Sequence, residues 1–263
     1  FSTWSVNSFF QSIIENKFVY FDEYWYDNGG LPSILVNYLK THELNIFEYL
    51  DKDKFLKVSS DDFKNPTALT TINQNVLMCQ TGYLTLRSDL NKTSTVALGI
   101  PNGEIYKALN RLLANNIFKG NTDITDDYGR SLLEVGTVDD IINLFNSALN
   151  SVSYDNYPIV SESSVQNMLK LYLLGAHQEV LSEVHEAKGR ADLVVNTDNK
   201  RIVFEFKYAK NETEAKSKLS EAVEQIKSRD YGNILPKKNE LLRIAAVFNA
   251  DPKVRAFTEY QEV

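Results

Sequence analysis

The protein has 263 residues, of which 43% are hydrophobic and 11% aromatic, a composition that supports one large or two ordinary globular cores and excludes a disordered chain. Its single cysteine, Cys79, excludes an intrachain disulfide and fits the reducing cytoplasm, and no apolar run approaches the roughly 20 residues of a membrane-spanning helix. The net charge of −7 argues at first against a nucleic-acid partner, because phosphate binding usually leaves a basic surface.

The first part of the sequence is predicted to be mostly helical. Apolar residues spaced three and four apart indicate helices at residues 4–14 and 32–38. The short apolar runs VLMCQTGYLTLRS and STVALGIPN are predicted as strands around turns, and residues 103–118 as an amphipathic helix. We therefore expect residues 1–118 to form a mostly helical, winged-helix-like region.

Residues 119–160 are polar and rich in Asp and Asn, with one helical segment at residues 138–149. A stretch of this composition is typical of a connection between domains. We therefore expect a linker with one helix over residues 119–160 and a second domain over residues 161–263.

The second domain is predicted to be an α/β fold, because its pattern from Ser161 onward is helix, three strands, helix, strand. A helix follows Asn211, which with Glu214 forms a sequence typical of a helix N-terminus, and Gly232 is its expected end. The expected strands are residues 179–186, 190–196, 201–208 and 241–248, and the apolar stripe of the last helix is Ala215, Leu219, Ala222, Val223 and Ile226.

Charged residues interrupt two of the apolar strands, at Asp192, Glu205 and Lys207. Because side chains alternate along a strand, Glu205 and Lys207 lie on the same face. If residues 198 and 199 are the two central residues of a tight hairpin, Asp192 lies directly across from Glu205. Such partners have Cβ atoms about 4.5–5.5 Å apart, a spacing that lets two carboxylates share one cation.

These three charges predict metal-assisted hydrolysis of a phosphodiester. Two crowded carboxylates on a partly buried face repel each other, and Lys207 offsets only one of them. Mg²⁺ or Mn²⁺ would balance the remainder, and the ammonium group can position or activate an attacking water. The alternative is a ladder of ion pairs on a sheet face that is open to solvent.

The charge of the chain is unevenly distributed. Residues 1–186 contain 13 Lys and Arg against 23 Asp and Glu, whereas residues 187–263 contain 15 against 12. The basic last third is compatible with binding of a polyanion, although a solvated surface of mixed charge gives the same count.

Several phrases resemble a known family. GRAD and VFEFK, followed by a helix that ends in EQIKSRDYG, resemble the PD-(D/E)XK nuclease superfamily, in particular the nuclease-like C-terminal domain of bacterial AAA-ATPase-like proteins. YWYDNGGLPSIL, QTGYLTL and LGIPNGEI resemble the segment that follows the ATPase core in those proteins. The resemblance implies a restriction-endonuclease-like mixed sheet flanked by helices over residues 161–263.

The sequence departs from that family in two places. Ala191 stands where the superfamily's name has a proline, although the catalytic chemistry does not need that residue. No G-x-x-x-x-G-K-[ST] motif occurs, so the ATPase core is missing. Because the chain starts at Phe1, we expect it to be part of a longer protein with an upstream ATPase domain.

The resemblance also implies the roles of the central site residues. Asp192 and Glu205 would be metal ligands, with the backbone carbonyl of Phe206 as a further ligand, and Lys207 would be the catalytic lysine. Glu162 matches an acid that often supports the site, although it also suits the first turn of a helix, where the macrodipole favours a negative charge.

A second group of residues is expected to face the substrate. Gln225 and Tyr231 match the helix motif that faces the phosphates, although Gln225 also fits a plain surface amide. Gly189 permits a close approach at the strand entrance, and the neighbouring Arg190 suits contact with a phosphate.

The sequence therefore predicts a Mg²⁺- or Mn²⁺-dependent nuclease that acts on nucleic acid, with DNA favoured. The alternative is a catalytically inactive module that uses the nuclease fold to bind nucleic acid or a protein partner. A third hypothesis gives residues 1–118 the role of coupling an upstream ATPase to the C-terminal domain. The sequence leaves the oligomeric state open.

Overall fold

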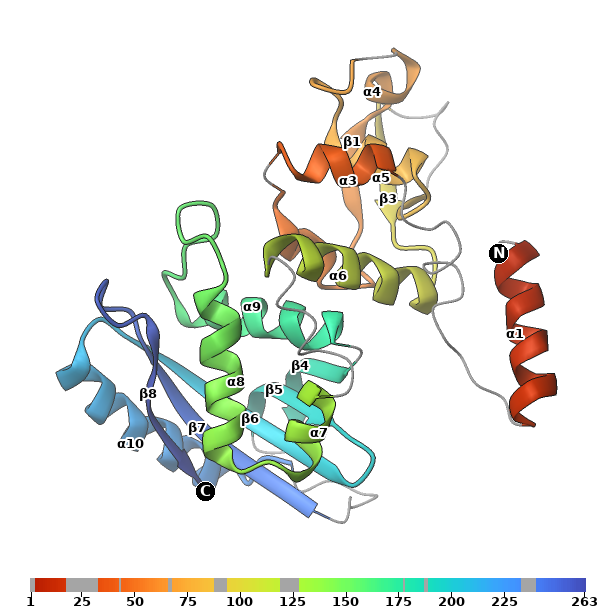
Figure 1. Cartoon of the computed structure of the whole chain (residues 1–263). Helices are drawn as coiled ribbons and strands as arrows, with labels where there is room; N and C mark the ends of the chain where they lie inside the picture. The colour runs from red at the N-terminus through yellow and green to blue at the C-terminus, as the bar shows by residue number, and fades with distance from the viewer. Residues whose placement is uncertain are drawn as a thin grey trace. The chain divides into compact units, whose positions relative to one another are not determined.

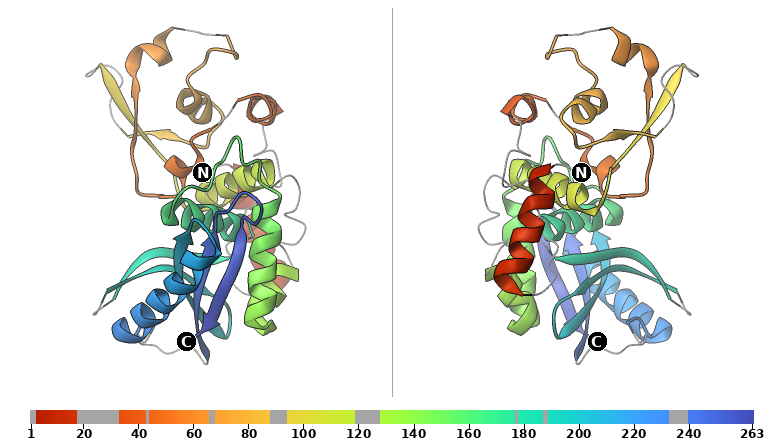
Figure 2. Two further views of the ribbon diagram at one scale, coloured as in Figure 1. Left: turned by 90° about the vertical axis from the view of Figure 1, so that its left-hand side faces the viewer. Right: turned by 90° about the vertical axis from the view of Figure 1, so that its right-hand side faces the viewer.

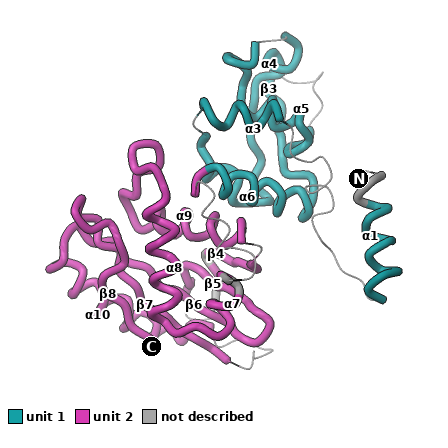
Figure 3. The backbone as a smooth tube through the Cα atoms, viewed as in Figure 1, with its two compact units in different colours: residues 1–116 teal, residues 117–263 magenta. Residues whose placement is uncertain are grey.

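The computed structural model describes residues 3–17, 33–42, 44–65, 68–87, 94–118, 128–176, 178–186, 189–232 and 240–263. The chain divides into two compact units, residues 1–116 and 117–263 (Figures 1 and 3). Most of the YWYDNGGLPSIL phrase lies outside the described residues. Among those that are described, no helix is long and apolar enough to cross a membrane.

The first unit is mostly helical and contains a small antiparallel sheet of strand order β1-β3-β2. A helical segment precedes β1, helices α4 and α5 follow it, and β2 and β3 come next, so the expectation of a mostly helical N-terminal region is confirmed. The elements are α1 (Thr3–Asn16), α3 (Ser33–Leu39), η1 (Ile46–Tyr49), β1 (Leu56–Ser59), α4 (Ser60–Lys64), α5 (Gln74–Gln80), β2 (Thr85–Leu86), β3 (Thr95–Gly99) and α6 (Gly103–Ile117).

The prediction of a strand at VLMCQ is wrong, because these residues form most of helix α5. The side chain of Asn73 caps this helix by accepting a hydrogen bond of 2.9 Å from the backbone N–H of Asn75. Short apolar runs suit a buried helix as well as a strand, and the cap decided between them. Only Thr85 and Leu86, near the end of the run, form strand β2.

The second unit is built on a five-stranded mixed sheet of order β4-β5-β6-β7-β8. Strands β6 and β7 are parallel and are joined through helix α10, whereas the other neighbouring pairs are antiparallel. The elements are α7 (Tyr128–Val135), α8 (Val138–Asn150), α9 (Glu162–Gly175), β4 (Glu179–Glu186), β5 (Gly189–Asn196), β6 (Lys200–Ala209), α10 (Glu212–Arg229), β7 (Glu240–Asn249) and β8 (Ala256–Glu262). The expected restriction-endonuclease-like fold of a mixed sheet flanked by helices is confirmed.

Two elements of this unit differ from the prediction. The described part of residues 119–160 contains two helices, α7 and α8, rather than one, and α8 packs against β8. The edge strand β8 was not predicted, because only Phe257 of its side chains is buried and the strand carries a weak apolar signal.

Strand β6 is covered on both faces (Figure 2). On one face, Val203 packs with Ala222 and Ile226 of helix α10. On the other, the ring of Phe204 lies 5.3 Å from that of Phe145 in helix α8. All residues of β6 except Tyr208 are therefore buried, as is typical of a central strand in an α/β sheet.

The predicted hairpin register is confirmed over four residue pairs, from Asn196–Arg201 to Leu193–Phe204. The turn is closed by the N–H of Thr197, which donates to the carbonyl of Lys200. The ladder between β5 and β6 ends at Leu193–Phe204, so the direct pairing predicted for residues 192 and 205 is not part of it. The two strands separate where the charged residues lie.

The turn after helix α10 depends on Gly232, whose φ of +82° favours glycine. A Cβ there would lie 2.7 Å from Leu241 Cδ1 and 2.8 Å from Val203 Cγ2. We expect Gly232→Ala to lower the free energy of unfolding by about 2–4 kcal/mol, from backbone strain and overpacking together. Urea unfolding followed by circular dichroism measures this, and Gly103→Ala, where a Cβ would meet no atom within 4 Å, is the control. A loss below about 1 kcal/mol would show that the turn tolerates a side chain.

Candidate active site

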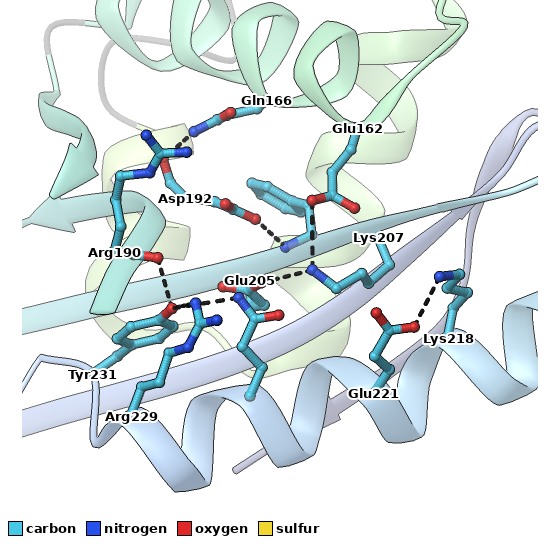
Figure 4. A network of polar contacts seen from close by, with 12 residues as sticks. Glu162, Gln166, Arg190, Asp192, Glu205, Lys207, Lys218, Glu221, Arg229 and Tyr231 are labelled. Atoms are coloured by element: carbon cyan, nitrogen blue, oxygen red, sulfur yellow. Dashed lines mark hydrogen bonds and ion pairs between the residues drawn. The ribbon is translucent and has the colours of Figure 1, made fainter. Parts of the chain in front are cut away.

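The site begins where strand β5 leaves strand β6. The backbone N–H of Phe206 donates a hydrogen bond of 2.8 Å to the carboxylate Oδ2 of Asp192 (Figure 4). Strand β5 continues to pair with β4 as far as Gly189–Glu186. A side-chain carboxylate therefore takes a position that a strand carbonyl would otherwise occupy, and this contact fixes Asp192 beside β6.

Helix α9 contacts the backbone of Asp192. The amide nitrogen of Gln166 donates to the backbone carbonyl of Asp192. Gln166 is not among the site residues predicted from the sequence, although its spacing from Glu162 could have indicated it. It lies four residues after Glu162, and residues spaced by four share one face of a helix.

Glu205 is fully buried, with 0% of its surface exposed. Its Oε1 accepts a hydrogen bond of 2.7 Å from Lys207, whereas its Oε2 is buried without a hydrogen-bond partner. Burial, followed by repulsion from the carboxylate of Asp192, raises the pKa of Glu205 to about 7. The site thus contains a carboxylate that is costly to ionise and that has one oxygen unused.

Lys207 connects the strand to helix α9. Its Nζ lies 2.7 Å from Glu205 Oε1 and 3.4 Å from Glu162 Oε1, and only 6% of the residue is exposed (Figure 4). Burial opposes the charge, but the hydrogen bond to Glu205 and the nearby carboxylates outweigh it and raise the pKa of Lys207. The alternative of a solvent-exposed ladder of ion pairs does not describe this buried arrangement.

The position of Glu162 suits both of its expected roles, as a charge in the first turn of a helix and as an acid that supports the site. It is the first residue of helix α9, directly after the N-cap Ser161, and its side chain reaches Lys207 from there. The residue is partly exposed, so its carboxylate lies at the border between the buried pair and solvent.

Tyr231 organises the other side of the site. Its hydroxyl donates a hydrogen bond of 2.6 Å to the backbone carbonyl of Arg190, and it accepts bonds from Arg229 at 2.7 Å and from Gln225 at 3.4 Å. Tyr231 is fully buried, whereas the Arg190 side chain is exposed. Tyr231 was expected to face the substrate. In this structure it is buried, and its hydroxyl holds the backbone of strand β5 at Arg190.

Arg229 is a residue that the sequence did not single out. A Cβ on Gly189 would lie 2.5 Å from Arg229 Cδ, so the close approach expected at Gly189 is made by this arginine. Arg229 and Gly189 are 40 positions apart in the chain, and no local spacing signals their contact.

The residues present fit a hard divalent cation. Within the described ranges, no three His, Cys, Asp or Glu side chains are grouped so that they could hold a metal ion. The available donors are two carboxylates, Asp192 on strand β5 and Glu205 on strand β6, which are close enough for the charge of Asp192 to raise the pKa of Glu205. Mg²⁺ is commonly bound by one or two carboxylates with waters and phosphate oxygens, and the unused Oε2 of Glu205 suits such an ion.

Comparison with known proteins agrees with this geometry. Residues 160–258, which include Asp192, Glu205 and Lys207, match the PD-(D/E)XK nuclease superfamily. Searches of curated proteins and of solved structures found no significant match. The family match covers the sheet and the helices that carry the site, and it suggests nuclease activity for this region of the chain.

Proposed function

We propose that the protein is a metal-dependent nuclease that hydrolyses phosphodiester bonds, with DNA as its substrate. The observation that carries this proposal is the buried, incompletely bonded Glu205 beside Asp192 and Lys207, inside the region that matches the nuclease superfamily. An unsatisfied buried carboxylate is rare in a folded protein and calls for a functional reason.

Asp192 and Glu205, with the carbonyl of Phe206, would hold Mg²⁺ or Mn²⁺. When bound, the ion supplies positive charge that neutralises the two carboxylates and stabilises the charge that builds on the phosphate. The hydrogen bond from Phe206 to Asp192 and that from Gln166 to the Asp192 backbone hold this ligand in place. Preorganised ligands of this kind are held by such outer contacts.

Lys207 is the residue that acts on the water or on the phosphate. Its ammonium group has three N–H donors, of which Glu205 and Glu162 each accept one. The remaining donor can orient an attacking water or stabilise the developing negative charge. Arg190, whose side chain is exposed at the strand entrance, would contact a neighbouring phosphate, and Gln225 and Tyr231 would support that position.

We also propose that residues 1–118 connect this nuclease to an upstream ATPase domain. The support is the resemblance of QTGYLTL and LGIPNGEI to the segment that follows the ATPase core in AAA-ATPase-like proteins. The sequence encoded upstream of Phe1 tests this, because a G-x-x-x-x-G-K-[ST] motif is expected there.

The nuclease proposal is tested with supercoiled plasmid, single-stranded DNA and RNA, each incubated with Mg²⁺, Mn²⁺ or EDTA. We expect the wild-type protein to cleave DNA only with a divalent ion, and Asp192→Asn to reduce the rate by about 100-fold or more, because the variant keeps an acceptor for Phe206 but loses the charge. Asp198→Asn makes the same change on the exposed hairpin turn and should leave the rate unaltered.

Two results would contradict the proposal. Cleavage by Asp192→Asn at the wild-type rate would remove Asp192 from the site. No cleavage of any substrate by the wild-type protein would instead support the catalytically inactive module that binds nucleic acid or a protein partner.

A further inference from the structure

A cavity lies in the second unit, away from the candidate active site. It has a volume of about 140 Å³ and lies between the C-terminal end of α8, the segment that follows it, β7 and the turn before β8. We call it the Arg255 pocket. The residues that line it include Asn150, Tyr154, Tyr157, Ile159, Phe248 and Arg255.

The Arg255 pocket is on the opposite face of the sheet from Glu205 and Lys207. Phe248 packs edge-on against Phe257, with ring centroids 5.6 Å apart, and Phe257 in turn packs with Phe145 of helix α8. Phe248 therefore belongs to the aromatic layer under α8, whereas Glu205 alternates with Phe204 and Phe206 and faces the α10 side.

Arg255 is unfavourably placed in two respects. Its Nε is buried without a hydrogen-bond partner. Leaving a buried donor unsatisfied destabilises the folded protein. Its φ of 43° is also in the left-handed region, which is strained for a residue with a Cβ.

One stabilising contact is present, since the guanidinium carbon lies 3.5 Å from the centre of the Tyr154 ring. This contact stabilises the guanidinium group but gives the Nε–H no acceptor. A residue that is both strained and unsatisfied is a sign of a functional position.

The chemistry of the walls indicates the ligand. A guanidinium group recognises phosphate oxygens through several N–H donors, and aromatic side chains provide surfaces for a planar ring. The volume is close to the roughly 150 Å³ that holds one benzene ring, so the pocket has room for one ring, and the rest of a larger ligand would lie at its opening. We propose that the Arg255 pocket binds a nucleotide, with its phosphate at Arg255 and its base against the aromatic wall. The choice of a nucleotide rests on the proposed nuclease function, which would supply one as product or as the end of a strand.

The proposal is tested by calorimetry in EDTA, so that neither cleavage nor a metal contributes. The ligands are deoxyadenosine 5′-monophosphate, deoxyadenosine, inorganic phosphate, and a short single strand of DNA with or without a 5′-phosphate. We expect Arg255→Gly and Arg255→Gln to weaken binding of the phosphorylated ligands by about tenfold or more, the loss of one charge-assisted hydrogen bond.

The variants separate binding from folding. Gly adopts a φ of 43° without strain, so Arg255→Gly should unfold at or near the wild-type temperature. Lys253→Ala removes an exposed positive charge from the same turn without touching the Arg255 pocket, and it should bind as the wild type does.

If the affinity for the monophosphate falls in the Arg255 variants, the ligand is a free nucleotide. If only the affinity for the 5′-phosphorylated strand falls, the ligand is the end of a strand. If neither depends on Arg255, or if inorganic phosphate binds as tightly as both, the Arg255 pocket is not a nucleotide site. Failure of the nuclease proposal would leave this result unchanged, because the assay needs no cleavage.

Discussion

Replacing Lys207 with Ala should reduce DNA cleavage by about 10²–10³-fold while the protein still binds a divalent ion. The reason is positional, because Lys207 Nζ lies within 3.4 Å of Glu162 and 2.7 Å of Glu205, one of the two proposed ligands. Plasmid nicking with saturating Mn²⁺ measures the rate, and calorimetry with Mn²⁺ measures whether binding is retained.

The control must separate chemistry from folding, since Lys207→Ala also leaves Glu205 without its hydrogen bond. Removing one partner of a buried ion pair costs about 3–5 kcal/mol, so the assay is run below the unfolding temperature measured for the variant. Lys216→Ala removes an exposed lysine that pairs with Glu212 on the surface of helix α10, and it should cleave at the wild-type rate. Equal cleavage by Lys207→Ala and the wild type would remove the hydrolytic role of this residue.

The sequence was sufficient to predict the hairpin because its turn and its period are both local. A two-residue turn at residues 198 and 199 sets the register, and alternation then assigns each side chain to a face. The structure has this register at all four recorded pairs. Helix α10 was equally predictable from the sequence, because Asn211 caps it and Ala215, Ala222 and Ile226 form its buried stripe.

The contacts of the site that the sequence does not predict join segments that are far apart in the chain. The separation of β5 from β6 depends on a side chain that replaces a strand carbonyl, and no periodic pattern predicts such an exchange. Arg229 meets Gly189 only through the fold. Gln166 is the intermediate case, because its spacing from Glu162 is visible but its partner, the carbonyl of Asp192, is not.

Replacing Glu205 with Gln should make the metal-free protein more stable above pH 7. Burial and then repulsion from Asp192 raise the pKa of Glu205 from 4.5 to about 7. The folded protein therefore retains a proton that the unfolded chain releases between these values. The contribution of Glu205 to stability is complete below about 4.5 and is lost as pH rises through about 7, a change on the order of 3 kcal/mol.

Lys207 does not alter this slope. Its pKa is raised above 10.5, so its own contribution is present throughout the acidic and neutral range and is lost only at more alkaline pH. The new amide nitrogen of Glu205→Gln lacks an acceptor, which costs about 1 kcal/mol, whereas Lys207 keeps its ion pair with Glu162 and is not left as a buried charge without a partner. We therefore expect the variant to be about 2 kcal/mol more stable than the wild type at pH 8 and to lose the pH dependence between 4.5 and 7.

Urea unfolding in EDTA at pH 4, 6 and 8 measures this difference. Glu240→Gln is the matched control, because Glu240 is 55% exposed in its ion pair with Lys200, and such pairs contribute little to stability. A Glu205→Gln variant that is less stable than the wild type at pH 8 would mean that the ion pair with Lys207 outweighs the cost of burial. The position of Glu205 would then need no metal to explain it.

Adding Mn²⁺ at pH 8 should reverse the order of the two proteins. The wild type gains about 2.7 kcal/mol at a metal concentration 100 times its Kd, whereas Glu205→Gln, with one ligand charge removed, gains far less. The same carboxylate would thus destabilise the protein without the ion and stabilise it with the ion. This opposite response distinguishes a metal ligand from a structural ion pair, because a structural pair contributes equally in EDTA and in Mn²⁺.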